Sequence, residues 1–267
     1  MSGESAFEGV LRQIDDSVPF KPGYYNESYL DRRITARMRR RGTDSHREYE
    51  RLLREEGDER EALMDALTIN VTEFFRNPEM WEVLRTVLTD LTDEQRRVRV
   101  WSAPCADGRE AYSLAMLACD DPDIDESRVE VLGSDISEEA LENARTGVYH
   151  TTRTTDIAEE LAPLAEPDRH VERDDDAFRV RDAPRRLVEF GTHDLISDGS
   201  RGPFDVVLCR NLLIYIDTDH KGSLFDTLEA SLTEGGVLVV GMTESVPPDR
   251  TAGYEPVDKR RRVFRRR

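Results

Sequence analysis

Hydrophobic positions between residues 1 and 91 recur every three or four residues, which is the period of an amphipathic helix. The predicted helices bury the following positions: Phe7, Val10, Leu11 and Ile14; Leu30, Ile34 and Met38; Tyr49, Leu52 and Leu53; a span from Glu59 to Leu67; and Trp81, Leu84, Leu88 and Leu91. Ser45 and Glu48 have the spacing of a capping box, and Asn77 with Pro78 supplies N-cap and first-turn signals. We therefore predict an all-helical domain over residues 1–91.

From Val98 onward, short runs of strand-forming residues alternate with helical patterns. Strands are predicted at 98–101, 129–133, 178–180, 187–190, 204–209 and 237–242, followed by an antiparallel hairpin of 254–257 with the arginine-rich tail. This alternation is typical of a mostly parallel α/β sheet with helices on both faces. We place the domain boundary at 91–97 and assign 92–267 to the second domain. The polar, proline-containing stretch at about 150–190 is expected to leave the sheet as a small β excursion.

The stretch from Val98 to Met116 predicts a strand, a loop and a helix that bind a ligand. Its one glycine, Gly108, lets the loop turn tightly, and in open α/β sheets ligands lie beyond the carboxyl ends of the strands. Asp135 ends the second predicted strand, where a carboxylate accepts hydrogen bonds from both ribose hydroxyls of a nucleoside. The loop lacks the G-x-G-x-x-G pattern that binds a pyrophosphate. This disfavours NAD and favours a ligand without phosphates, such as S-adenosylmethionine.

The charge balance is strongly acidic, because 56 Asp and Glu against 38 Lys and Arg give a net charge of −18. Only Lys21, Lys221 and Lys259 are lysines, and we interpret this composition as adaptation to high salt in a halophilic, archaeal source. The acidity disfavours nonspecific nucleic-acid binding. The cysteines are scattered, which predicts that the protein has no disulfides and no metal site. The sequence has no signal peptide and no membrane-spanning run, which predicts a cytoplasmic protein without membrane insertion.

Five motifs occur in order along the chain: LTINVTEFFRNP, VRVWSAPCADGREAYSLAM, SDIS, DVVLCRNLLIYID and LTEGGVLVVGMTES. Together they resemble the CheR family of chemoreceptor glutamate methyltransferases over nearly the whole chain. The resemblance implies a small all-α domain followed by a class I, Rossmann-like methyltransferase domain that binds S-adenosylmethionine. It also implies methyl transfer to glutamate carboxylates on the cytoplasmic helices of chemoreceptors, with S-adenosylhomocysteine as the product. We expect the enzyme to be a monomer that does not bind nucleic acid.

The resemblance implies which residues form the site. It assigns cofactor binding to these positions: Asn70, Thr72, Arg76, Glu110, Asp135, Asp194, Leu195, Asn211 and Leu212. Arg76 and Tyr215 are expected to face the reacting carboxylate as the catalytic residues. Arg33, Arg37 and Arg39 are expected to contact the receptor, although a run of arginines on a helix is equally compatible with a solvated cationic face.

The chain departs from the family pattern at a few positions. Arg109 and Ala111 stand in GREAYS where GEEPYS is usual, and Asp194 stands where asparagine is usual, whereas Glu110 is retained. Two other functions remain open at this point: a non-catalytic protein that binds S-adenosylmethionine or a receptor, and a nucleic-acid methyltransferase suggested by the arginine clusters. Retention of the residues assigned to the cofactor favours the enzyme.

Overall fold

The computed structural model describes residues 5–68 and 72–267, which form two units. The smaller unit comprises residues up to 70 together with 215–221, and the larger comprises 71–214 and 222–267. The division thus falls earlier than the predicted boundary at 91–97. The reason is that the helix at 78–94 buries Trp81 and Leu84 in the same core as the first strand of the larger unit.

The smaller unit is helical, as the hydrophobic periodicity predicted. Its elements are α1 (Ala6–Ser17), α2 (Glu27–Arg41), α3 (His46–Glu55) and α4 (Gly57–Leu67), with short 3-10 turns at Pro22–Tyr24 and Thr218–His220. Ser45 caps α3 as expected, since its Oγ accepts from the Glu48 N–H at 3.3 Å. The Glu48 carboxylate instead accepts from the backbone N–H of Asp44 at 3.2 Å, so the predicted capping box is displaced by one residue.

The strap of residues 215–221 joins this unit through backbone bonds. The Asn26 N–H donates to the Tyr215 carbonyl at 2.9 Å, and the Asp217 N–H donates to the Tyr24 carbonyl at 2.8 Å. The Tyr215 ring lies 4.8 Å from the Tyr29 ring, measured between centroids. These contacts place Tyr215 beside the start of α2.

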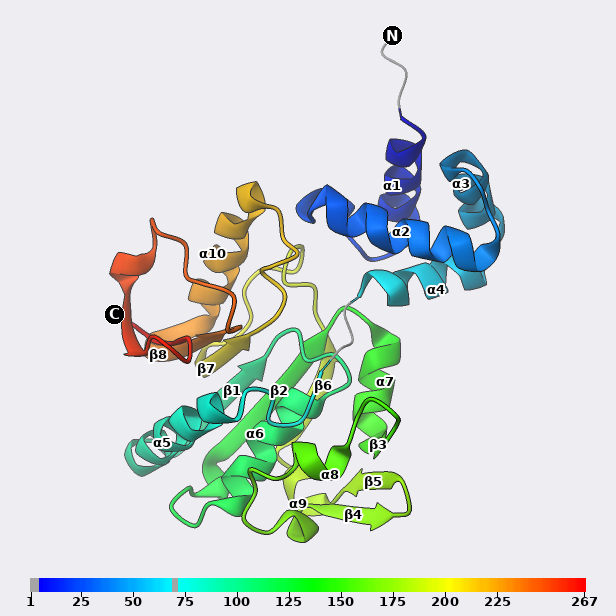
Figure 1. The fold of residues 1–267 in the computed structure, drawn as a ribbon. Helices are drawn as coiled ribbons and strands as arrows, with labels where there is room; N and C mark the ends of the chain where they lie inside the picture. Colours follow the sequence, from blue (N-terminus) through cyan, green and yellow to red (C-terminus); the bar gives the residue numbers. More distant parts are fainter. Residues whose placement is uncertain (1–4, 69–71) are drawn as a thin grey trace. The chain divides into compact units, whose positions relative to one another are not determined.

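The larger unit contains an open seven-stranded sheet with the order β6-β2-β1-β7-β8-β10-β9 (Figure 1). Its strands are β1 (Val98–Ser102), β2 (Val129–Asp135), β6 (Val188–Thr192), β7 (Phe204–Cys209), β8 (Leu232–Val240), β9 (Tyr254–Asp258) and β10 (Val263–Arg266). Its longer helices are α5 (Pro78–Glu94), α6 (Arg109–Asp120), α7 (Glu138–Thr146) and α10 (Lys221–Ser231). Strands β6, β2, β1, β7 and β8 are parallel, and β10 is antiparallel to β8 and β9. The order confirms the predicted α/β fold, and it reverses between β1 and β7, which places a topological switch point beside the loop after β1.

A continuous hydrophobic core lies between this sheet and the helices α5 and α6. Trp81 and Leu84 of α5 pack in one cluster with Leu114 of α6 and with Val100 and Val206 of the sheet. Complete burial of side chains of this size stabilises a fold by roughly 1.5 to 3 kcal/mol each. The core therefore fixes where β1 ends and α6 begins, which is where the predicted ligand loop lies.

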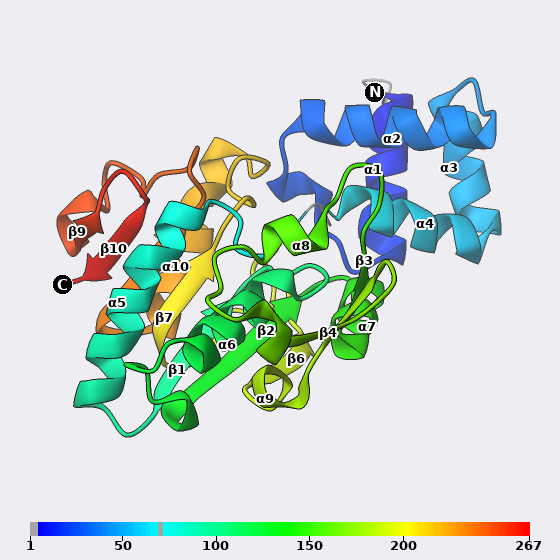
Figure 2. The same ribbon diagram turned by 60° about the horizontal axis from the view of Figure 1, so that its bottom comes forward.

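The excursion predicted at about 150–190 forms its own small sheet with the order β3-β5-β4. Its elements are β3 (Val148–His150), α8 (Ile157–Glu160), β4 (Val171–Asp174), β5 (Ala177–Val180) and α9 (Asp182–Arg185). Figure 2 shows α8 beside the chain segment that leads into α5. Ile157 and Phe178 belong to the same core as α5 and α6, so the excursion packs on the larger unit.

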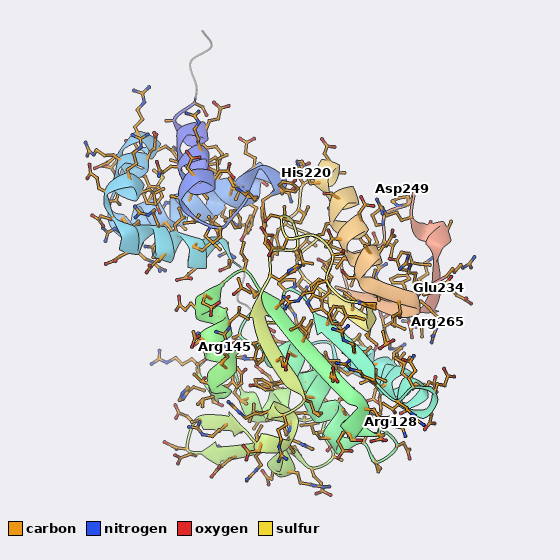
Figure 3. The ribbon with its side chains drawn as sticks, turned by 180° about the vertical axis from the view of Figure 1, so that it is seen from behind. Arg128, Arg145, His220, Glu234, Asp249 and Arg265 are labelled. Carbon is orange, nitrogen blue, oxygen red and sulfur yellow. The ribbon has the colours of Figure 1, made fainter. Side chains whose placement is uncertain are left out.

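The arginine-rich tail forms the predicted antiparallel hairpin, because β10 pairs with β9. Its arginines bind carbonyl groups: Arg265 Nη1 donates to Gly235 at 3.2 Å, and Arg266 Nη1 donates to Glu229 and Leu232 at 2.7 Å. Figure 3 shows Arg265 beside Glu234, which lies in the first half of β8. These arginines thus link β10 to the first half of β8 and to α10.

Candidate active site

The loop after β1 turns into α6 at Gly108, which has a φ of +87°. A Cβ at this position would lie 2.7 Å from the Ala144 Cβ and 2.9 Å from the Phe190 ring. Only glycine meets both the left-handed backbone and this close approach. The close packing of α6 against α7 and β6 therefore requires glycine here, as the sequence analysis expected for a tight turn.

Glu110 lies in the first turn of α6, almost buried, between two side chains. Its Oε1 accepts from Ser102 Oγ at 2.8 Å, and its Oε2 accepts from Arg210 Nη1 at 2.9 Å. The side chains of Glu110 and Arg210 are 10% and 2% exposed. A carboxylate has about four acceptor positions, so Glu110 keeps capacity to bind a cationic ligand group.

Asp135 ends β2 and is buried. Its Oδ2 accepts from the Ala106 N–H at 2.8 Å and its Oδ1 from the Ser137 N–H at 3.0 Å. Burial raises the pKa of the Asp135 carboxyl above its ordinary value, while these two N–H donors act in the opposite direction. The bonds orient the carboxylate toward the ligand loop and leave a lone pair on each oxygen, which is the capacity that two ribose hydroxyls need.

The segment Thr72–Asn77 leads into α5 and contains two of the predicted site residues. Asn70 lies outside the described residues. The Thr72 carbonyl accepts from Arg109, and the Arg76 carbonyl accepts from Arg210 Nη2 and from Trp81 Nε1, both at 3.0 Å. Asn77 is the N-cap residue of α5 and Pro78 its first residue, as predicted, but the Asn77 side chain makes no cap hydrogen bond: its Oδ1 accepts from Arg210 Nη2 at 2.7 Å, and its φ is +61°.

Asn211 and Leu212 follow β7 in a loop that a buried glutamate organises. Glu244 accepts from the N–H groups of Asn211 at 2.9 Å, Gly241 at 2.6 Å and Ile214 at 3.3 Å. Burial raises the pKa of Glu244, and the backbone donors oppose this. Asn211 has a φ of +63°, a left-handed conformation that these bonds hold.

Asp194 follows β6, and its own loop engages its carboxylate. Oδ1 accepts from the Ile196 N–H at 2.9 Å, and Oδ2 accepts from the Ser197 hydroxyl. The neighbouring Leu195 is 6% exposed. The structure therefore gives the Asp194 side chain a turn-forming role, and its predicted contact with the cofactor remains a prediction.

These residues fit S-adenosylmethionine on the chemistry of their donor set. Asp107, Glu110 and Asp135 bring three carboxylates to the ligand loop or its flanks, and the ligand carries an ammonium and a sulfonium. The loop presents no arginine or lysine between Ser102 and Gly108 for a phosphate. The acidic lining and the nucleoside-binding position of Asp135 thus both match this ligand.

The arginines predicted to contact a receptor differ in their surroundings. Arg39 is exposed on α2, and the half-buried Arg33 lies 5.5 Å from the centroid of the Tyr29 ring. Arg37 is buried and donates to both oxygens of Glu59, at 3.0 and 2.6 Å. The prediction for Arg37 is therefore corrected: its guanidinium is committed to an internal carboxylate and is not presented to a partner.

The sequence analysis did not single out Arg210, Asp107 or Glu244. A charged residue directly after a fully buried strand, as Arg210 follows β7, is a signal that could have indicated it. Arg210 contacts Glu110, Arg76 and Asn77, so it joins the carboxyl end of β7 to α6 and to the segment Thr72–Asn77.

No three His, Cys, Asp or Glu side chains within residues 5–68 and 72–267 are placed to hold a metal ion. Burial raises the pKa of the Cys105 and Cys209 thiols well above the ordinary value, so both stay protonated and fill space. No helix in the described part of the chain combines the length and the hydropathy needed to cross a membrane.

An open, mostly parallel sheet, an acidic loop with one glycine after β1 and a buried acid at the end of β2 define a class I methyltransferase that binds S-adenosylmethionine. The profile of the "CheR methyltransferase, SAM binding domain" matches residues 70–263. The profile of the "CheR methyltransferase, all-alpha domain" matches residues 5–68. The chain belongs to the CheR methyltransferase family.

Similar proteins in other organisms carry the corresponding name. A "Chemotaxis protein methyltransferase" of Listeria monocytogenes is 31% identical over 227 residues, which cover 83% of each chain. A "Chemotaxis protein methyltransferase 1" of Pseudomonas aeruginosa is 33% identical over 242 residues, again covering 83% of each chain. The similarity therefore includes both the helical unit and the sheet.

Replacing Asp135 by alanine is expected to weaken S-adenosylmethionine binding more than tenfold. The reason is the loss of hydrogen bonds to a charged acceptor, which contribute roughly 1.5 to 3 kcal/mol. Calorimetric titration measures the affinity, and circular dichroism verifies that the variant is folded. Glu139→Ala, on the exposed face of α7, is the control and should bind normally. Unchanged affinity in folded Asp135→Ala would remove Asp135 from the site.

Asp107→Asn is expected to raise the free energy of unfolding at pH 8 by up to about 3 kcal/mol. Burial raises the pKa of Asp107 from 3.8 to about 6, against the attraction of Arg109. The folded protein thus holds this proton more tightly than the unfolded chain does. The contribution of Asp107 to the free energy of unfolding therefore falls as the pH rises from 3.8 through about 6. Urea denaturation at pH 8 and pH 4 should show a gain only at pH 8. The exposed Asp123→Asn should show none, and an equal gain at both values would refute the assignment.

Proposed function

We propose that this methyltransferase transfers the methyl group of S-adenosylmethionine to glutamate side chains of chemoreceptors and forms glutamyl methyl esters. The observation that carries the proposal is that the family match includes both units, together with the name shared by relatives that are at least 30% identical and align over most of their length. The receptor glutamates belong to helices exposed in the cytoplasm, where we place the enzyme.

Methyl transfer to a glutamate carboxylate needs little acid or base catalysis from the protein. A glutamate side chain has an ordinary pKa near 4.3, so at neutral pH it is already ionised and nucleophilic. When bound, S-adenosylmethionine supplies a methyl group on a positively charged sulfur. What remains for the chain is to hold the two reactants in line and to exclude water, which together supply a large part of the rate.

Arg76 is our candidate for orienting the receptor carboxylate, with Tyr215 as a second anchor. The backbone of Arg76 is held at its carbonyl by Arg210 and Trp81, so its side chain starts from a fixed point. Asp135 would hold the ribose, and Glu110 would bind the ammonium of the methionine part. A strong ion pair with Arg76 would weaken the nucleophile, so we assign Arg76 an orienting role.

The experiment that tests this proposal uses S-adenosylmethionine with a labelled methyl group and membranes that contain chemoreceptors. Label that is retained on the receptor and released by mild alkali is expected, because methyl esters hydrolyse in base. Asp135→Ala serves as the inactive control. Label resistant to alkali, or label on RNA, would contradict the proposal, and cofactor binding without transfer would favour a non-catalytic signalling protein.

Reversing the charge at Arg33 and Arg39 is expected to raise the KM for the receptor roughly tenfold, while kcat stays close to the original value. A body with net charge −18 repels receptor carboxylates, so binding needs local cations. The increase should shrink at 1 M salt. Arg51→Glu, which changes an exposed arginine of α3, should leave the KM unchanged. An unchanged KM in the double variant would refute a receptor contact through α2.

A further inference from the structure

The segment Thr72–Asn77 has no regular backbone pairing, and side chains from other elements hold it instead. The Phe74 N–H donates to Glu160 Oε2 at 2.9 Å, and the Phe75 N–H donates to Ser113 Oγ at 2.9 Å. The Thr72 carbonyl accepts from Arg109 Nη1 at 3.1 Å. An irregular segment keeps one conformation only when such bonds hold its polar groups. The position of Arg76 therefore depends on residues distant in sequence.

One of these residues, Glu160, belongs to the excursion. It ends α8, and residues of the segment and of α8 line the same cleft of about 760 Å³. The side chains of Phe74 and Phe75 are buried in the core of the larger unit, and the bond from the Phe74 N–H to Glu160 adds a polar link between the segment and α8. Figure 2 shows how close α8 comes to the chain before α5.

Glu160 also pairs with Arg109 at the start of α6. The Arg109 Nη1 lies 3.4 Å from both Glu160 oxygens, and the two side chains are only 14% and 12% exposed. The Arg109 guanidinium lies 5.3 Å from the centroid of the Tyr149 ring, which belongs to β3. Poor access to water strengthens such a pair relative to a surface pair. Arg109 and Glu160 thus connect α6, the excursion and the segment at one point.

We propose that Arg109 and Glu160 form a clasp that positions the segment Thr72–Arg76 for catalysis, so that the excursion is a working part of the active site. The proposal rests on the proposed function, because Arg76 is assigned there to the receptor carboxylate. Both are positioning residues: Arg109 fixes the Thr72 carbonyl, and Glu160 fixes the Phe74 N–H and the Arg109 guanidinium. Without them the segment samples several conformations, and fewer encounters align the carboxylate with the methyl group.

The two bonds of Glu160 can be separated by substitution. In Glu160→Gln the side chain still accepts from the Phe74 N–H but no longer carries the charge that attracts Arg109. In Glu160→Ala both interactions are lost. Glu159→Ala is the matched control, because Glu159 is the neighbouring residue of α8 and is exposed.

The experiment measures backbone hydrogen exchange of residues 72–76, together with kcat and the KM for each substrate, in the full-length variants. In Glu160→Ala we expect exchange at the Phe74 amide to rise at least tenfold and kcat for receptor methylation to fall about tenfold. In Glu160→Gln the exchange rate and kcat should lie between those of Glu160→Ala and the wild type. In Glu159→Ala both should equal the wild-type values. Arg109→Gln should reproduce the loss of kcat, whereas Arg109→Lys should recover part of it.

Two results would overturn the clasp. One is unchanged exchange at 72–76 in Glu160→Ala. The other is faster exchange with unchanged kcat and KM, which would make the pair merely structural. If the wild type methylates no receptor, the proposed function fails. The clasp is then still judged by exchange and by the affinity for S-adenosylmethionine, which should fall in Glu160→Ala.

Discussion

Replacement of Arg210 by alanine is expected to lower the free energy of unfolding of the larger unit by about 3 to 5 kcal/mol. The Glu110 carboxylate would stay buried without its cation, and the Arg76 carbonyl and the Asn77 side chain would lose a donor. Urea denaturation followed by circular dichroism measures the effect. S-adenosylmethionine binding should weaken as well, because Arg210 orients Glu110.

Two further variants make this result specific. Arg210→Met combined with Glu110→Gln removes both charges and should be less destabilising than Arg210→Ala, since no unpaired charge remains buried. Arg97→Ala removes an exposed arginine that pairs with Glu130 and should leave the unfolding midpoint unchanged. Equal midpoints for Arg210→Ala and the wild type would show that this pair does not stabilise the fold.

Replacement of Glu59 by alanine is expected to destabilise the helical unit by a similar amount, about 3 to 5 kcal/mol. Glu59 accepts from Arg37 in α2 and from the Tyr49 hydroxyl in α3 at 2.7 Å. Its side chain is 2% exposed. Without it, the largely buried Arg37 and Tyr49 lose their acceptor, and three helices lose their common contact. Thermal unfolding of the helical signal measures the loss.

A second variant, Arg37→Ala, distinguishes a structural role of Arg37 from receptor binding. Arg37→Ala should lower both stability and receptor methylation, and the loss of methylation should diminish at a lower temperature, where the unit is folded again. Arg40→Ala, an exposed arginine of the same helix, should leave the stability unchanged. A folded Arg37→Ala with a raised receptor KM would restore Arg37 as a contact residue.

Local sequence patterns predicted much of the fold correctly, because secondary structure follows local periodicity. The spacing of Leu30, Ile34 and Met38 sets one buried face of α2, and all three are buried. The alternation of strands and helices after Val98 led to the parallel sheet. The position of Asp135 at the end of β2 followed from the same pattern.

The boundary between the units could not be read from the local pattern. The helix α5 has the same amphipathic periodicity as the four helices before it, and the sequence analysis grouped them for that reason. What separates α5 is the partner of its apolar face, since Trp81 packs in the core of the larger unit. A hydrophobic stripe specifies that a helix is buried but does not specify against which element.

The sequence by itself determined the longer helices, the strands of the main sheet, the loop after β1 and the acid at the end of β2, because each depends on residues close together in the chain. Only the tertiary structure decided which charges are internal. Arg37 and Arg39 are both cations of α2, and they differ because the Arg37 guanidinium donates to both oxygens of Glu59 whereas Arg39 is exposed. Asn77 has the signal of a helix cap, yet Arg210, distant in sequence, takes its side chain. A pairing between distant residues leaves no periodic trace, since it depends on where the packed core places each element.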